Sequence, residues 1–183
     1  MYYFVPLKHV AIGIGALLIA GRLPGVLNPQ RFRDFARKFP RSVPWGIAFL
    51  TISAVWCSII VSGASEEGMV IRKEIVYAFI WGIYAGLIFL KFDFLAVRGL
   101  AIVLMLIAKV IVDSANQLET PWRLVMTVLA YIWAIASMWF TVSPWRMRDL
   151  LDWVTATDAR TRLKCGIGCA VGVLLITLGL FAY

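Results

Sequence analysis

Histidine is almost absent from this chain of 183 residues, in which His9 is the only one. Bis-histidine haem ligation, histidine-based metal sites and Ser-His or Cys-His nucleophile pairs all require histidines at defined places. One histidine at the mouth of an apolar segment supplies none of these sites, and we interpret it as a polar residue at an interface. We therefore expect no cofactor.

Charged residues are also scarce, since 15% of the residues are charged and 62% are apolar. Soluble domains contain about half apolar and about a quarter charged residues. The runs 75–90 and 99–108 contain no charge, which no single compact core explains. The composition predicts an all-α, polytopic membrane protein that forms a single membrane domain.

Acidic residues are fewer than basic ones, ten against 18, and the net charge is +8. In a soluble protein this excess would indicate nucleic acid, but here the basic residues lie in short clusters between apolar runs. We therefore expect anionic lipid headgroups at the cytoplasmic face as partners, and no nucleic acid. The three cysteines indicate no disulfide framework. Cys165 and Cys169 would supply half of a zinc site, but packing is the better interpretation.

A length of about 20 residues per span divides the apolar runs into six predicted transmembrane helices. They lie near residues 5–26, 43–63, 70–91, 95–113, 121–142 and 163–183. The third and fourth are joined by only four residues, 91–94. We therefore expect these two helices to form a tight antiparallel hairpin.

Basic residues are concentrated in alternate loops. Thirteen of the 18 fall there, four fall in the remaining loops, and Lys109 lies within the fourth span. Cytoplasmic loops carry an excess of Lys and Arg. The bias therefore predicts that both termini are on the non-cytoplasmic side.

Residues 28–35 and 143–150 share one pattern: a capping residue, Pro, any residue, Arg, an apolar residue, Arg, Asp and an apolar residue. We interpret each copy as the start of a short amphipathic helix at the membrane surface, with Asn28 or Ser143 as N-cap and proline at the first helical position. The predicted helices cover residues 29–39 and 144–154. Four arginines are assigned to lipid headgroups: Arg31, Arg33, Arg146 and Arg148.

These two helices make a parallel internal repeat. Each copy has the order span, short amphipathic helix, span, and the copies cover residues 5–63 and 121–183, with a helical hairpin at 70–113 inserted between them. Chance similarity of two interfacial helix starts is the alternative. Each unit resembles the YjeT-like small inner-membrane hairpin proteins, most closely over residues 143–183. That resemblance implies a bacterial inner-membrane location and no reaction.

Small residues on apolar helices are candidates for helix–helix contact, because they let two helices approach closely. The candidates are Gly82 and Gly86 in the third predicted span, and Gly168 and Gly172 in the sixth. The most polar outer segment follows the fourth span, and Lys109, Asp113 and Asn116 form a candidate outer site there. A structural ion pair between Lys109 and Asp113 is the alternative.

The sequence offers no carboxylate pair, Ser-Lys pair or metal-ligand cluster at mid-membrane depth, so we expect no enzyme. We expect an accessory or scaffolding subunit that contacts other membrane subunits or itself. A channel or carrier for a neutral solute or lipid is the alternative, because parallel repeats occur in transporters. Deep tryptophans such as Trp56, Trp81 and Trp133 would suit lipid packing, or else a quinone or pigment.

Overall fold

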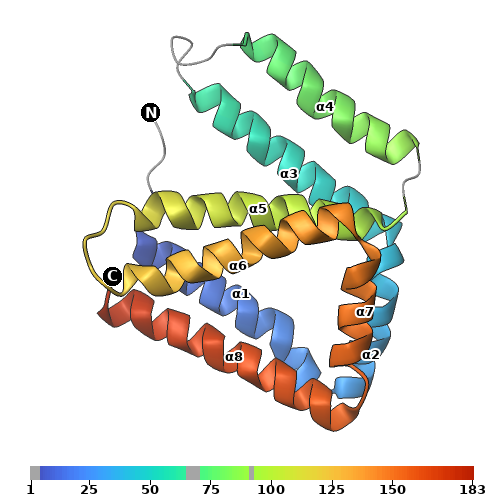
Figure 1. The fold of residues 1–183 in the computed structure, drawn as a ribbon, viewed down its shortest axis with the longest axis vertical. Coiled ribbons are helices and arrows are strands. Elements are labelled where there is room, and N and C mark those ends of the chain that lie inside the picture. The colour runs from blue at the N-terminus through green and yellow to red at the C-terminus, as the bar shows by residue number, and fades with distance from the viewer. Residues whose placement is uncertain (1–4, 65–70, 91–92) are drawn as a thin grey trace.

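The computed structural model describes residues 5–64, 71–90 and 93–183. In these residues the chain forms eight α-helices and one short 3-10 helix (Figure 1). They are α1 (Leu7–Leu27), α2 (Pro29–Lys38), η1 (Phe39–Arg41), α3 (Val43–Gly63), α4 (Lys73–Phe89), α5 (Leu95–Ala115), α6 (Arg123–Val142), α7 (Trp145–Val154) and α8 (Asp158–Phe181). The prediction of an all-α fold is confirmed.

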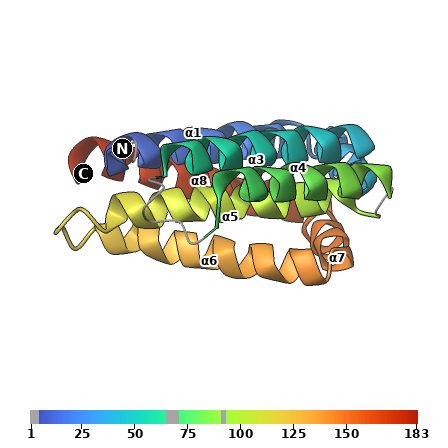
Figure 2. The same ribbon diagram turned by 90° about the horizontal axis from the view of Figure 1, so that it is seen from above.

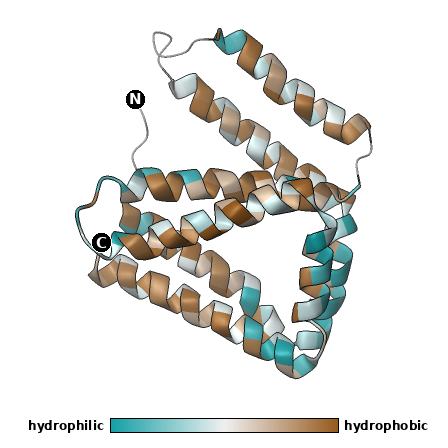
Figure 3. Cartoon of the chain, viewed as in Figure 1, coloured by the Kyte–Doolittle hydropathy of each residue, from teal (hydrophilic) through white to brown (hydrophobic). Residues whose placement is uncertain are grey.

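Five of the described helices, α1, α3, α5, α6 and α8, are long and apolar enough to cross a membrane. Figure 3 shows these helices mostly brown, whereas the hydrophilic residues gather on α2, α7 and the adjoining helix ends. The chain is therefore a multi-pass membrane protein. The helix in the third predicted span, α4, has 17 residues, which at 1.5 Å per residue is about 25 Å and short of an apolar layer of about 30 Å. Val70 and Lys91, the ends of that predicted span, lie outside the described residues.

Helix α5 is the central helix of the molecule. It packs against α3 on one side and α6 on the other, and 44% of its most apolar stretch is buried, against 17–22% for the other four long helices. The hydrophobic core joins four helices near the start of α1 and the end of α8, with Ala11 from α1, Ile111 from α5, Met126 from α6 and Leu175 from α8. Away from this core the α1–α8 pair and the α5–α6 pair diverge (Figure 1).

The third and fourth predicted spans, α4 and α5, do not pack side by side, so the prediction of a tight antiparallel hairpin is wrong. Helix α4 packs against α3, and it diverges from α5 after the connection (Figure 1). Two tyrosines face α3: the Tyr84 hydroxyl lies 3.1 Å from the Thr51 hydroxyl, and the Tyr77 hydroxyl donates to the Ser58 carbonyl at 3.4 Å. The physical reason is that α3 and α6 already cover α5, so a short connection brings the ends of α4 and α5 together without aligning their axes.

The short helices α2 and α7 lie across one end of the long helices. Figure 2 shows the long helices side by side, with α7 seen nearly end-on beyond them. Helix α8 begins at Asp158, five residues before the predicted span, because the Thr157 hydroxyl accepts from the Arg160 amide at 3.3 Å and so caps an additional polar turn.

Candidate functional site

The basic segments of the sequence come together at one end of the molecule, on α2, η1, α7 and the first turns of α8 (Figures 1 and 3). Residues 28–41 and 143–164 contain ten basic and four acidic residues. We call these two segments the basic layer. Its excess of positive charge makes it a surface for anions.

Helix α2 begins as the sequence predicts. The Asn28 side chain accepts from the Arg31 amide at 3.3 Å, and Pro29 occupies the first helical position, where a missing N–H costs nothing. Arg37 and Lys38 lie in the last turn, where positive charge interacts favourably with the helix dipole. The prediction of an Asn28 cap is confirmed.

Helix α7 begins differently from α2. It starts at Trp145, with Pro144 before it, and no side chain caps its first turn. The predicted side-chain cap by Ser143 is therefore wrong. The Ser143 carbonyl instead accepts from the Arg146 amide at 3.1 Å, which is a turn bond that the sequence pattern does not distinguish from a cap.

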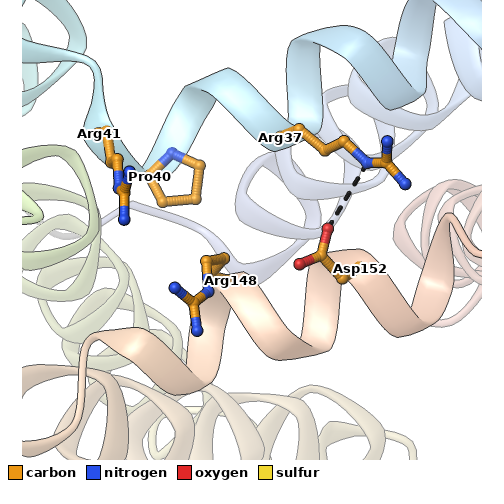
Figure 4. A pocket seen from close by; sticks show the side chains of 5 residues that line it. All are labelled: Arg37, Pro40, Arg41, Arg148 and Asp152. Carbon is orange, nitrogen blue, oxygen red and sulfur yellow. Dashed lines mark ion pairs between the residues drawn. The ribbon is translucent and has the colours of Figure 1, made fainter.

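Ion pairs join α2 to the second half of the chain. Arg33 is partly buried and pairs with Asp158 at the start of α8, and the Arg37 Nε lies 3.6 Å from an Asp152 carboxylate oxygen on α7. Arg37 and Asp152 occupy equivalent positions when the patterns at 28–35 and 143–150 are extended by two residues. The two helices run antiparallel (Figure 4), as a two-fold axis between two copies of one unit requires.

The equivalence ends at the long helices. Helix α1 packs along α8, whereas the equivalent helices α3 and α6 each pack against α5. A two-fold repeat would place α3 against α6, as α1 lies against α8. Helix α5, from the inserted segment, lies between α3 and α6 instead.

A pocket of about 520 Å³ opens between η1, α2 and α7. Arg37, Pro40 and Arg41 line it from one side, and Arg148 and Asp152 line it from α7 (Figure 4). Pro40 is fully buried. Because the proline ring fixes φ, Pro40 restrains the turn that carries Arg41. The lining carries three positive charges and one negative charge, which makes the pocket suited to an anion.

The four arginines that the sequence assigns to headgroups differ in their surroundings. Arg31 and Arg146 are exposed, Arg33 is tied to Asp158, and Arg148 lines the pocket beside Asp149 at 3.1 Å. Arg37 and Arg41 lie beyond the repeated segment 28–35, so the repeat does not mark them as candidates. The fixed turn at Pro40 was the available signal for Arg41.

Aromatic side chains border the basic layer. Phe35, Phe39, Trp45 and Phe49 form a chain of ring contacts with centroids 5.8–6.4 Å apart. On the other side, the Trp153 ring lies 4.7 Å from the Lys164 ammonium. Aromatic rings of this kind favour the boundary between lipid and water.

A seam of small residues joins α1 to α8. A Cβ at Gly172 would lie 2.8 Å from the Gly15 carbonyl oxygen, and one at Gly25 would lie 2.4 Å from the Cys165 sulfur. At Gly168 the neighbour is Arg22, 3.0 Å away. Gly15 and Gly25 were not singled out from the sequence, because neither belongs to a motif that marks a contact face. Cys165 is fully buried in this seam.

The glycines of α4 have no such neighbours. A Cβ at Gly82 or at Gly86 would meet nothing within 4 Å. These two candidate contact residues therefore touch no other helix of the described chain.

The candidate outer site lies at the end of α5. Lys109 pairs with Asp113 four residues on, both side chains are about half exposed, and Asn116 is exposed. Nearby, the Tyr183 hydroxyl donates to the Trp122 carbonyl at 2.7 Å. The contact between Lys109 and Asp113 agrees with the structural ion pair that the sequence offers as the alternative.

Among the described residues, no three side chains of the metal-binding types His, Cys, Asp and Glu come together. No protein-family model, curated protein or solved structure matches the chain. The resemblance to the small hairpin proteins therefore stays a prediction.

Proposed function

We propose that the chain is a non-catalytic protein of the bacterial inner membrane that acts as an accessory or scaffolding subunit of a larger membrane complex. The observation that carries the proposal is the outward face of α4. This helix has no buried residue, and its one substantial neighbour is α3. Most of its surface is therefore available to lipid or to another protein.

Helical geometry places the small residues of α4 away from α3. At 100° per residue, Tyr77 and Tyr84 share the face that bonds to α3, whereas Gly82 and Gly86 lie about 140–180° from that face. Ile75 and Phe79 lie beside the glycines and are 58% and 68% exposed. We call these four residues, Ile75, Phe79, Gly82 and Gly86, the α4 outer face. A small-xxx-small pair with bulky neighbours is a typical surface for close helix packing in membranes.

We propose six spans, both termini on the non-cytoplasmic side and the basic layer at cytoplasmic headgroups. The start of α1 and the end of α8 lie at the same end of the molecule (Figure 1), which supports an even number of crossings. Helix α4 returns the chain from the far end of α3 to the start of α5. The 13-to-4 bias of basic residues supports the direction.

Gly82→Leu tests the proposed docking at the α4 outer face. A Cβ at position 82 meets no other helix within 4 Å in the described part of the chain, so the fold is expected to persist while a partner helix is displaced. Overpacking of about 1–3 kcal/mol would weaken the assembly recovered in mild detergent from native membranes by about fivefold to about 150-fold. The size of that assembly is measured by native electrophoresis and mass photometry.

Gly13→Leu is the matched control. Gly13 is also exposed, on α1, and a Cβ there meets nothing within 4 Å. The proposal expects this variant to assemble like the wild type. If Gly82→Leu leaves the assembly intact, or if the wild type is recovered only as single chains, the proposed subunit role is wrong.

A further inference from the structure

Three arginines line the pocket between η1, α2 and α7. Each is held in place by a neighbouring side chain that engages only part of its guanidinium group. Arg37 uses its Nε toward Asp152, and Arg148 uses its Nε and one terminal nitrogen toward Asp149. The Arg41 guanidinium lies over the Phe94 ring, 5.9 Å from its centroid. A ring contact occupies the face of a guanidinium and leaves its N–H groups available in the plane.

We propose that this pocket binds one phosphate group, carried by the headgroup of an anionic phospholipid, through Arg37, Arg41 and Arg148. Guanidinium groups form paired, charge-assisted hydrogen bonds with phosphate oxygens. Asp152 is occupied by Arg37, so the lining retains a net positive charge for the phosphate. The volume, about 520 Å³, is within the range of about 300–1,000 Å³ usual for small-molecule sites and exceeds what a bare phosphate fills.

Two features favour a lipid as the carrier of the phosphate. The pocket lies at the ends of the long apolar helices (Figure 1). The exposed aromatic residues Phe35 and Trp153 belong to the basic layer, and exposed Trp45 borders it through its ring contact with Phe35. Basic pockets between helices at the cytoplasmic side of a membrane recognise anionic headgroups. The inference rests on the proposed function for the position of the basic layer at the membrane surface, but it needs no protein partner.

The test compares two double variants of the isolated, delipidated protein in a non-ionic detergent. Arg41→Gln with Arg148→Gln removes two charges from the pocket lining. Arg31→Gln with Arg146→Gln removes two charges from the same basic layer outside the pocket. All four arginines are exposed, so both variants are expected to fold, and equal thermal unfolding temperatures check this.

Native mass spectrometry measures how many phosphatidylglycerol molecules each protein holds, with phosphatidylcholine as the neutral comparison. The wild type is expected to hold one phosphatidylglycerol per chain in preference to phosphatidylcholine. The pocket variant is expected to lose affinity by about tenfold or more, since two sets of charge-assisted bonds disappear. The control variant is expected to lose about threefold or less.

Equal losses in the two variants would overturn the pocket, because they would indicate attraction by total charge alone. Absence of a one-to-one complex in the wild type would overturn it as well. If inorganic phosphate binds the delipidated protein as tightly as phosphatidylglycerol does, a lipid is the wrong source. Because the isolated chain is used, each of these results leaves the assembly test with Gly82→Leu unaffected.

Discussion

At the scale of single residues, glycines, which have no Cβ, allow α1 and α8 to approach each other closely. The Gly15 carbonyl oxygen would lie 2.8 Å from a Cβ at Gly172, and the Ile19 side chain would lie 2.7 Å from it. A side chain can rotate away, but a helical carbonyl cannot move without displacing its own helix. The contact therefore requires glycine at position 172.

Gly172→Ala is expected to destabilise the protein by about 1–3 kcal/mol through overpacking. Gly166→Ala, on the same helix, is expected to be neutral or to stabilise it by up to about 1 kcal/mol, because a Cβ there meets nothing within 4 Å and alanine favours a helix. The apparent unfolding temperature in one detergent should fall for the first variant and hold or rise for the second. A fall of equal size in both would show that the seam is not tightly packed.

Some single residues could be predicted from the sequence and others could not. The Asn28 cap depends on residues within one turn, so a local pattern was sufficient. The seam glycines Gly15 and Gly25 could not be assigned, because a helix that is apolar on all sides gives no indication of which face packs. Gly82 and Gly86 carry the best-known contact motif, yet inside this chain they touch nothing.

At the scale of elements, α2 and α7 differ from every other helix in having a strongly polar side. Phe32 and Phe35 of α2 fall on one face together with Phe39, the first residue of η1, and Asp34 and Lys38 of α2 fall on the other. Such a helix is stable at a lipid–water boundary, with its apolar face in the lipid and its polar face in water. The proposed position of the basic layer depends on this division.

Spin labels placed one at a time along residues 30–39, from α2 into the start of η1, test this orientation in anionic vesicles. Collision with oxygen, which concentrates in lipid, is expected to peak near Phe35 and Phe39. Collision with a water-soluble nickel reagent is expected to peak near Asp34 and Lys38, with a period of about 3.6 residues. Uniform exposure to the nickel reagent along the whole segment would place α2 in water instead.

The positions of the helices could be predicted from the sequence, but the packing of α4 could not. Hydrophobic runs located every long helix to within a few residues except at the start of α8, where the Thr157 cap adds a polar turn that hydropathy does not register. The packing of α4 could not be read from the short connection to α5. A short connection fixes the distance between two helix ends, whereas the crossing angle depends on which faces are already covered.

At the scale of the whole molecule, the chain is a set of long apolar helices joined at one end by a core and covered at the other end by the basic layer. The proposed topology puts the loop between α5 and α6 outside and the turn between α7 and α8 inside. Gln117 and Ala156 are exposed in these two connections, so they are suitable labelling positions.

Gln117→Cys and Ala156→Cys, each in a background without the three native cysteines, are expected to react on opposite sides of the membrane. An impermeant thiol reagent should label the first in intact spheroplasts and the second only after the membrane is opened. The background protein without cysteine is the control for reaction at other groups. Labelling of both positions from one side would contradict the proposed number or direction of spans.

The central claim is that this protein has no transport or redox activity of its own, and reconstitution of the purified chain alone into liposomes tests it most directly. Flux of ions, neutral solutes and labelled lipid would be measured on the same preparation as an absorption spectrum, with empty liposomes as the control. The account predicts flux equal to that of the empty liposomes and no bound chromophore. Rapid, saturable flux of a neutral solute or lipid, or a chromophore at about one per chain, would contradict it.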